Sequence, residues 1–283
     1  MKKILLLLLA FSLLAGKCKK NDDPADDGGD EQVYECLPEQ LNYTDHVDPS
    51  DSDQTLYTYE GNAIKEKKLN FTANDGTPGS YTYKYYYIDK AKGLLDRIEV
   101  FSSGQLVAKF LYTIQGDLIV KRKLIVVSQS GDTWFDAWEV FYTYDSNGKM
   151  IRLQVKDYDL WDEDDDGTPE PTDETAVYTY TGDNVTNIKW YDTADMNTVK
   201  EEYDFDYDTG KRTFDNVVTQ TYPTTRVNNV THTVRNIYGS NPTTEETFTT
   251  ITYNNKGFPT SFEVKDDRNN QLSTLAVTYE NCD

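Results

Sequence analysis

The chain has 283 residues, and its net charge is 28 − 49 = −21. This length accommodates one large β domain or two small ones. So acidic a chain repels phosphate backbones, which argues against nucleic acid as a partner, while it favours solubility and divalent cations. The 22 tyrosines and 11 phenylalanines, against three methionines, indicate strands, because aromatic side chains suit a pleated, half-buried surface.

Residues 1–18 have the pattern of a lipoprotein signal peptide. Lys2 and Lys3 precede an apolar run from residue 4 to residue 14, which is too short to span a bilayer. The segment LAGKC that follows resembles the lipobox of bacterial lipoproteins, in which the cysteine becomes lipidated. Lys17 departs from the small residue usual before that cysteine, but a simple secretory cut lacks a suitable pair of small residues. We therefore expect a lipid on Cys18.

Residues 19–40 predict a disordered acidic tether, because they contain few large apolar groups that could form a core. The first of them, KKNDD, resemble the start of many Bacteroidetes lipoproteins, where a lysine followed by acidic residues accompanies export to the outer face. This resemblance implies an outer-membrane, lipid-anchored and surface-exposed protein.

Residues 41–283 contain a repeat: an aromatic-x-Tyr segment, a polar turn with glycine, and a short run of alternating apolar residues. Clear copies begin at Tyr57, Tyr142, Tyr178 and Ile251, and Tyr279 closes the chain without a return strand. Alternating aromatics place residues i and i+2 on one face of a strand, and Asp, Asn and Gly tolerate the positive φ angles of tight turns. We predict a single all-β domain, a long antiparallel meander of seven or eight repeated hairpins with about 14–16 strands. The sheet is curled or open and barrel-like.

The repeat resembles two known patterns. The segment YTYDSNGKM is similar to the Tyr-Asp repeats of Rhs-type proteins. The segments ITYNNKGFPT and YENC are closer to a group of Bacteroidetes lipoproteins with a Tyr-rich domain of unknown function and a fold called porin-like. That resemblance covers about residues 55–283, and it implies a soluble curled sheet on a lipid anchor and no reaction.

A transmembrane barrel is a rival interpretation, and the strand sequences disfavour it. Such a barrel needs an apolar outward band on every strand. Charged runs interrupt these strands, as in residues 65–68 and 121–123.

Aromatic residues near the turn at residue 131 form a candidate binding rim. Trp134 and Trp138 are bulky enough to stack on a sugar or a peptide. The alternative is that they pack in the core or in cross-strand pairs, as most strand tryptophans do.

The cysteine count predicts one disulfide. With Cys18 acylated, Cys36 and Cys282 remain as an even pair in an oxidising compartment. The alternative is two unpaired thiols.

The longest connection between strands contains a candidate calcium loop. Carboxylates at loop positions 1, 3 and 5 can converge on one hard cation, and glycine at position 6 permits the sharp turn. The candidate ligands are Asp162, Asp164, Asp166, Thr168, Glu170 and Asp173. A solvated acidic loop is the equal alternative, and a calcium ion here would be structural.

The sequence contains no catalytic motif. His46 and His232 are the only histidines, and there is no phosphate loop or paired Cys-x-x-Cys. We expect no catalytic residues and no cofactor besides calcium. The most favoured function is a monomeric, non-catalytic binding or adhesion lipoprotein whose partner is an envelope glycan, peptide or protein. A structural envelope component and a glycan hydrolase are the alternatives.

Overall fold

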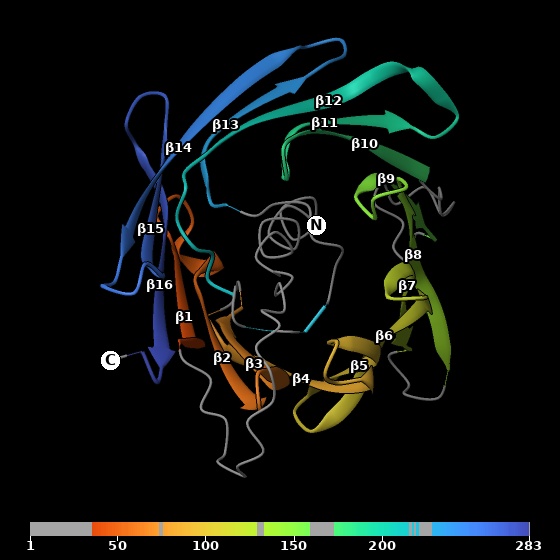
Figure 1. Cartoon of the computed structure of the whole chain (residues 1–283), viewed down its shortest axis with the longest axis vertical. Coiled ribbons are helices and arrows are strands. Elements are labelled where there is room, and N and C mark those ends of the chain that lie inside the picture. The colour runs from red at the N-terminus through yellow and green to blue at the C-terminus, as the bar shows by residue number, and fades with distance from the viewer. Residues whose placement is uncertain are drawn as a thin grey trace.

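The computed structural model describes residues 36–73, 76–128, 133–158, 173–214, 217, 219–220 and 228–282. They form sixteen antiparallel strands, each paired with its neighbours along the chain, and the last strand pairs with the first. The sheet is therefore a closed barrel, which Figure 1 shows nearly end-on. The predicted all-β meander of repeated hairpins is confirmed, and the sheet closes rather than staying open. No helix among the described residues is long and apolar enough to cross a membrane.

The strands are long and follow one another closely. The first begins before the boundary at residue 41 that the sequence suggests, so residues 37–40 belong to the barrel rather than to the tether. The strands are β1 (Leu37–Asp45), β2 (Asp53–Glu60), β3 (Ala63–Thr72), β4 (Pro78–Asp89), β5 (Leu94–Ser102), β6 (Gln105–Gln115), β7 (Leu118–Val127), β8 (Trp134–Tyr144), β9 (Met150–Asp157), β10 (Asp173–Thr181), β11 (Asn184–Asp192), β12 (Asp195–Tyr207), β13 (Val230–Ile237), β14 (Thr243–Tyr253), β15 (Pro259–Asp266) and β16 (Gln271–Glu280).

The two ends of the barrel are built differently. At one end, which we call the turn end, lie the connections β2–β3, β4–β5, and so on to β14–β15, and most of them are tight turns. Gly61, Gly148 and Gly257 take φ angles of 64°, 77° and 81° there, which a side chain at these positions would disfavour. The other end, which we call the loop end, carries the connections β1–β2, β3–β4 and so on to β15–β16.

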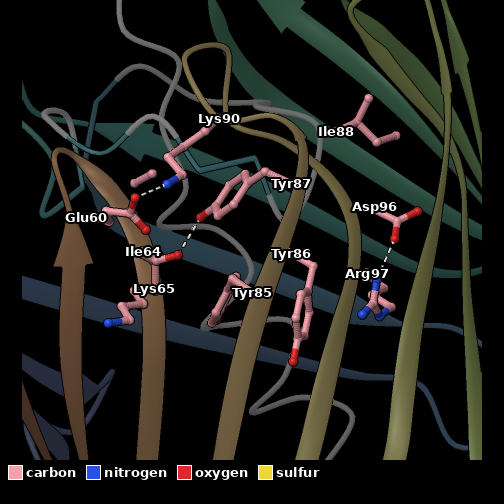
Figure 2. A pocket seen from close by; sticks show the side chains of 11 residues that line it. Glu60, Ile64, Lys65, Tyr85, Tyr86, Tyr87, Ile88, Lys90, Asp96 and Arg97 are labelled. Atoms are coloured by element: carbon pink, nitrogen blue, oxygen red, sulfur yellow. Dashed lines mark hydrogen bonds and ion pairs between the residues drawn. The ribbon is translucent and has the colours of Figure 1, made fainter.

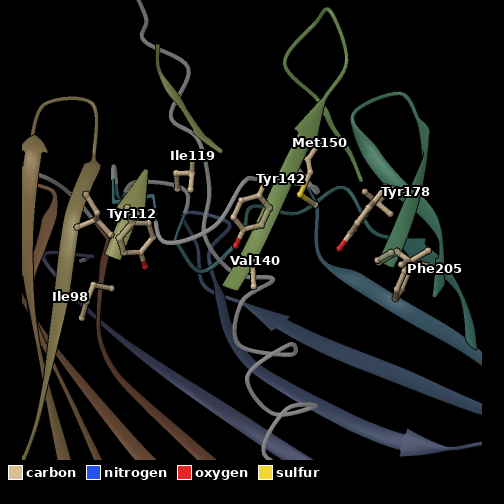
Figure 3. Packing of buried hydrophobic residues seen from close by; sticks show 12 residues of the cluster. Ile98, Tyr112, Ile119, Val140, Tyr142, Met150, Tyr178 and Phe205 are labelled. Carbon is tan, nitrogen blue, oxygen red and sulfur yellow. The ribbon is translucent and has the colours of Figure 1, made fainter. Parts of the chain in front are cut away.

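Aromatic residues line the inward face of the barrel. Cross-strand partners share a face, so the paired residues Tyr57, Lys67, Tyr83 and Val100 lie on the same side of β2 to β5. This side continues into the apolar cluster of Figure 3, which spans β5 to β12. It faces inward because the described part of the connection between β12 and β13 lies inside the ring of strands in Figure 1, and Phe214 of that part packs against Tyr57 with the ring centroids 5.4 Å apart.

Charged residues alternate around the outward face. Glu66, Lys84, Glu99 and Lys109 are successive cross-strand partners on β3 to β6. The pattern continues with ion pairs on later strands, namely Lys121–Glu139 at 2.5 Å, Lys123–Asp136 at 2.6 Å and Lys189–Glu202 at 3.2 Å. We call this band of alternating charges the outer girdle.

The last hairpin is closed by a disulfide in place of a chain turn. Cys36 and Cys282 are bonded, with their Cα atoms 4.4 Å apart, and they join the turn-end termini of β1 and β16. Cys36 donates its backbone N–H to the carbonyl of Asn281, and both residues take positive φ angles, 56° and 52°. Strand β16, which contains Tyr279, has no return strand after it in the chain, and β1 takes that place. The described barrel therefore contains eight hairpins.

Candidate functional site

Neighbouring hairpins separate from each other at the turn end. The registered pairs between β3 and β4 stop at Glu66 and Lys84, although β3 begins at Ala63 and β4 continues to Asp89. Backbone carbonyls in this gap lack a strand partner, and an unpaired buried carbonyl costs free energy.

The second tyrosine of the repeated motif supplies the missing donor. In the gap between β3 and β4, the Tyr87 hydroxyl donates to the Ile64 carbonyl at 2.6 Å. The same contact recurs around the barrel, from Tyr59 to Pro38, Tyr144 to Ile119, Tyr180 to Met150, Tyr207 to Val185 and Tyr279 to Pro259. In the two remaining hairpins, the equivalent position is occupied by Ile114, which has no hydroxyl, and by Tyr253, whose hydroxyl donates to Asp208.

These tyrosines explain the sequence repeat as architecture. Burial raises the pKa of Tyr87 and Tyr144 far above the ordinary value, so their hydroxyls remain protonated donors. Each such hydrogen bond contributes about 0.5–1.5 kcal/mol. The motif therefore specifies how hairpins join, and it does not mark a ligand site.

A hollow of about 490 Å³ lies in the β3–β4 gap (Figure 2). We call it the turn-end hollow. Five of its eleven described lining residues are charged, and four of these contact protein groups: Glu60 pairs with Lys90, and the Arg97 guanidinium lies 2.8 Å from Asp96 and 3.9 Å from the Tyr86 ring centroid. Because most of its charged groups already have protein partners, this hollow is a poor candidate for a ligand.

A larger hollow of about 760 Å³ lies at the loop end, beside the ends of β1 to β5. We call it the loop-end hollow. Its lining consists of Asn42, Tyr43, Thr44, Ser52, Asp53, Gln54, Asn70, Phe71, Thr72, Pro78, Gly79, Ser80, Ser102 and Ser103. Among the described lining residues one side chain is charged, although 27% of the whole chain is charged. This volume is typical of small-ligand sites.

A row of amide side chains crosses three strands beside this hollow, on the outward face of the wall and opposite to the face that carries Phe71 and Asp53. The amide oxygen of Asn42 accepts from Gln40 at 2.9 Å and from Gln54 at 3.2 Å, and the oxygen of Gln54 accepts from Asn70 at 3.2 Å. Within the described part of the chain, no hydrogen bond uses the amide nitrogen of Asn42 or the amide oxygen of Asn70. The row therefore retains one donor and one acceptor.

Glycine sets the position of the aromatic ring in the hollow. Phe71 is the cross-strand partner of Gly79, and a Cβ at Gly79 would lie 2.5 Å from the ring. The ring lies on the bare backbone and stacks on Tyr81, with the ring centroids 5.2 Å apart. No signal in the sequence indicated this site, because Phe71 and Gly79 are distant from the repeated motif.

Asp53, the one acid among the described lining residues, is partly buried. Desolvation raises the pKa of Asp53 to about 6, although the charge of Lys67 opposes this shift. Burial in turn lowers the pKa of Lys67 to about 8, and its ammonium lies 4.3 Å from the ring centroid of Tyr83. The oxygen Oδ1 of Asp53 is buried and has no hydrogen-bond partner among the described residues.

The structure separates the two tryptophans of the proposed rim. The pairing of β7 with β8 shifts between Trp138 and Asp136, and this bulge reverses the faces of the residues before it. Trp138 faces inward, 5.8 Å from the ring of Phe110 and 4.6 Å from the Arg122 guanidinium. Trp134 faces outward beside Lys109 and is 39% exposed. They do not form one rim, and sequence alternation could not reveal the bulge.

Other predicted site residues fall outside the described residues. Cys18 and five of the six calcium ligands, Asp162, Asp164, Asp166, Thr168 and Glu170, belong to this group. Asp173 is the first residue of β10. In the part of the chain that is described, no group of three or more His, Cys, Asp or Glu side chains is placed to hold a metal ion.

His46 is exposed, and His232 is half-buried. His46 is hydrogen bonded to Thr274 at 3.3 Å. The Nδ1 atom of His232 lies 3.0 Å from Asp206, and its ring stacks on Phe248 with centroids 4.5 Å apart. Neither geometry, within the described residues, activates a serine or cysteine nucleophile.

Comparisons with known proteins give a fold likeness. A porin-like protein from Bacteroides uniformis is similar, with a TM-score of 0.50 and 12% identity over 86% of this chain and 98% of that one. A porin-like protein from Bacteroides vulgatus has a TM-score of 0.40 and 12% identity over 87% and 99% of the two chains. No family model matches the sequence, and no curated protein matches it. The first likeness shows that the barrel fold is shared.

Proposed function

We propose that this chain is a lipid-anchored envelope protein whose barrel remains in water and binds a ligand without catalysis. The outer girdle is the observation that carries the proposal. A membrane-spanning barrel presents an apolar band to lipid, and a lysine at the midplane of that band costs about 2–4 kcal/mol. Here Glu66, Lys84, Glu99 and Lys109 form one row of cross-strand partners on four successive strands of the wall.

A lipid on Cys18 would hold such a barrel at a membrane that its wall does not enter. The description "porin-like" of the similar Bacteroides protein supports an envelope location. The basic and apolar signal, the cysteine after it and the acidic stretch support anchoring at the outer membrane, with the barrel exposed at the surface.

Fractionation tests the anchored, water-facing barrel. The wild-type protein should partition with membranes and enter a detergent phase, whereas Cys18→Ser should be soluble without detergent. Both should have the same melting temperature, because the anchor lies outside the barrel. A Cys18→Ser protein that remains in the membrane after alkaline extraction would contradict the proposal and favour a wall embedded in lipid.

The loop-end hollow supports binding over a purely structural role. The Phe71 ring lies on the inward face of the wall at this hollow, and the amide row on the outward face beside it retains hydrogen-bonding capacity among the described residues. The described lining residues of the hollow include one carboxyl group, Asp53, whereas glycoside hydrolysis commonly uses two acids facing each other. A glycan hydrolase is therefore less well supported at this site than a binding protein.

Arrays of oligosaccharides and of peptides, probed with the labelled full-length protein, test the binding role. Saturable binding that Phe71→Ala abolishes, without turnover of the bound compound, supports the proposal. Absence of binding on both arrays favours the structural component, and release of shortened products favours the hydrolase.

A further inference from the structure

The inward face of the loop-end hollow carries one acid between two aromatic residues. Tyr43, Asp53 and Phe71 are successive cross-strand partners on β1, β2 and β3, so their side chains share the inward face, and all three line the hollow. Gly79 of β4 is the next partner, and the Phe71 ring lies on its bare backbone. Because neighbouring strands are about 4.8 Å apart, one ligand group can contact the carboxylate and the ring together.

The acid in this row lacks a counterion in the described part of the chain. The oxygen Oδ1 of Asp53 is buried without a hydrogen-bond partner, and no described lysine or arginine forms an ion pair with the carboxyl group. The charge of Lys67 acts on it only from a distance, because the Lys67 ammonium lies 4.3 Å from the ring centroid of Tyr83, its cross-strand partner nearer the turn end. The Asp53 side chain is half-buried and lines the hollow, so a cation in the hollow can reach it.

The neighbouring acid Asp45 shows how a carboxylate at this end is satisfied by the protein. Its oxygen Oδ1 accepts from the backbone N–H groups of Val47 and Asp48, both at 2.8 Å, and Oδ2 accepts from the Tyr43 hydroxyl at 3.2 Å. No donor of this kind reaches Asp53 from the described residues, and desolvation raises the pKa of Asp53 to about 6. Asp53 is therefore ionised at neutral pH, and an incoming cation would supply the interaction that the protein does not.

The Phe71 ring also lacks a cation, unlike several other rings of the barrel. The Arg97 guanidinium lies 3.9 Å from the ring centroid of Tyr86, and the Lys109 ammonium lies 4.8 Å from that of Trp134. Among the described residues no lysine or arginine lies over Phe71. A cation within about 6 Å of an aromatic ring is attracted by the negative face of the ring. The ring and the acid beside it thus favour the same kind of group.

The charge of the whole chain favours such a ligand as well. A net charge of −21 attracts cations over long range and repels anions. Long-range attraction alone would act at any part of the surface, whereas the row on β1 to β3 combines a carboxylate without a counterion and a ring without a cation at one place.

We propose that the inward face of the loop-end hollow binds an aliphatic cation, an ammonium or guanidinium group on a carbon chain, with Asp53 as its counterion and Phe71 as the ring against which it packs. Lysine and arginine side chains of a peptide present this chemistry, and so do free polyamines. This inference rests on the proposed binding function and names its ligand class and site.

Titration calorimetry of the full-length protein tests the proposal with named probes. The cationic probes are the tripeptides Gly-Lys-Gly and Gly-Arg-Gly with blocked termini, and spermidine. The comparison probes are Gly-Lys-Gly with an acetylated lysine, which is neutral, and blocked Gly-Glu-Gly. At least one cationic probe should bind saturably, and the acetylated and acidic peptides should bind at least tenfold more weakly. Stronger binding of the peptides than of spermidine would identify a peptide as the source of the cation, and the reverse order a free amine.

Two variants locate the binding, and a third controls for net charge. Asp53→Asn removes the counterion and should lower the affinity at least tenfold, because a hydrogen bond to a charged group contributes about 1.5–3 kcal/mol. Phe71→Leu keeps an apolar side chain without the ring face and should lower the affinity about threefold. Asp183→Asn changes the net charge equally at the turn end, where Asp183 pairs with Lys149 at 3.0 Å, and should change the affinity less than twofold. Melting temperatures establish that each variant is folded, and the isosteric Asp53→Asn keeps the test open if Phe71→Leu does not fold.

The outcomes separate this inference from the proposed function. Equal losses of affinity in Asp53→Asn and Asp183→Asn would reduce the binding to general charge attraction and overturn the site. Equal affinity for the lysine peptide and its acetylated form would overturn the ligand class. Saturable binding on the oligosaccharide array with no affinity for any cationic probe would overturn the inference while the binding function stands. Failure on every probe and both arrays would overturn both.

Discussion

The two ends of the barrel use the same residue types for different purposes. At the turn end, tyrosine hydroxyls such as that of Tyr180 donate to backbone carbonyls, glycines form tight turns, and a disulfide completes the ring. At the loop end, amide and hydroxyl side chains lie around a larger hollow, and part of the amide hydrogen-bonding capacity has no partner among the described residues. The repeated motif therefore stabilises the barrel, whereas the candidate site is formed by residues outside the motif.

The disulfide should give the largest effect. Cys36→Ser with Cys282→Ser removes a bond between residues separated by 246 positions, and the chain-entropy model gives a loss of up to about 5 kcal/mol in the free energy of unfolding. Urea denaturation measures the loss, and adding reductant to the wild type should reproduce it while leaving the double variant unchanged. An equal midpoint in the two proteins would mean that the closing hairpin is stable without its covalent turn.

Removal of one tyrosine hydroxyl at the turn end should have the next largest effect. Tyr180→Phe leaves the Met150 carbonyl without its donor, at a cost of about 1–2 kcal/mol in the free energy of unfolding. Tyr191→Phe is the matched control, because its hydroxyl makes no hydrogen bond within the described residues and should cost little. Equal losses in the two variants would remove the distinction between motif tyrosines and other strand tyrosines.

Calcium should act at the loop end, where residues 158–172 connect β9 and β10. If residues 162–173 hold the ion, calcium at ten times its dissociation constant should stabilise the folded protein by about 1.4 kcal/mol. The melting temperature is measured in millimolar calcium and in chelator, for the wild type and for Asp164→Ala with Asp166→Ala. A wild-type melting temperature that calcium does not change, with no heat of binding, would leave a solvated acidic loop.

The pH dependence of Asp53 should give the smallest effect. Its pKa is raised to about 6 by burial, so its contribution to stability is present below pH 4 and is lost as the pH rises through 6. Because the side chain is partly exposed, we expect the wild type to lose on the order of 1 kcal/mol relative to Asp53→Asn between pH 4 and pH 7. Lys67 has a lowered pKa of about 8, so its contribution changes only at higher pH. Parallel stability curves of the two proteins from pH 4 to pH 7 would show that Asp53 is solvated like a surface acid.

The candidate site was less accessible to sequence reasoning than the fold. Trp134 and Trp138 are large enough to form a binding rim, but a bulge at residues 136–138 places them on opposite faces. Phe71 and Gly79 carry no local pattern, and their contact arises only because β3 pairs with β4 in one particular register. Bulges and registers depend on the neighbouring strand, which a single sequence does not display.

The sequence by itself determined the hairpins, the antiparallel meander and the cysteine pair. These follow from local chemistry, because aromatic residues alternate with the period of a strand and Asp, Asn and Gly permit tight turns. Only the tertiary structure decided that the sheet closes, that the aromatic face points inward, and that β1 returns to β16. The physical reason is that Leu41 meets Val277 only after all the strands between them have twisted and coiled into a ring. No local pattern in the sequence sets the sum of those twists.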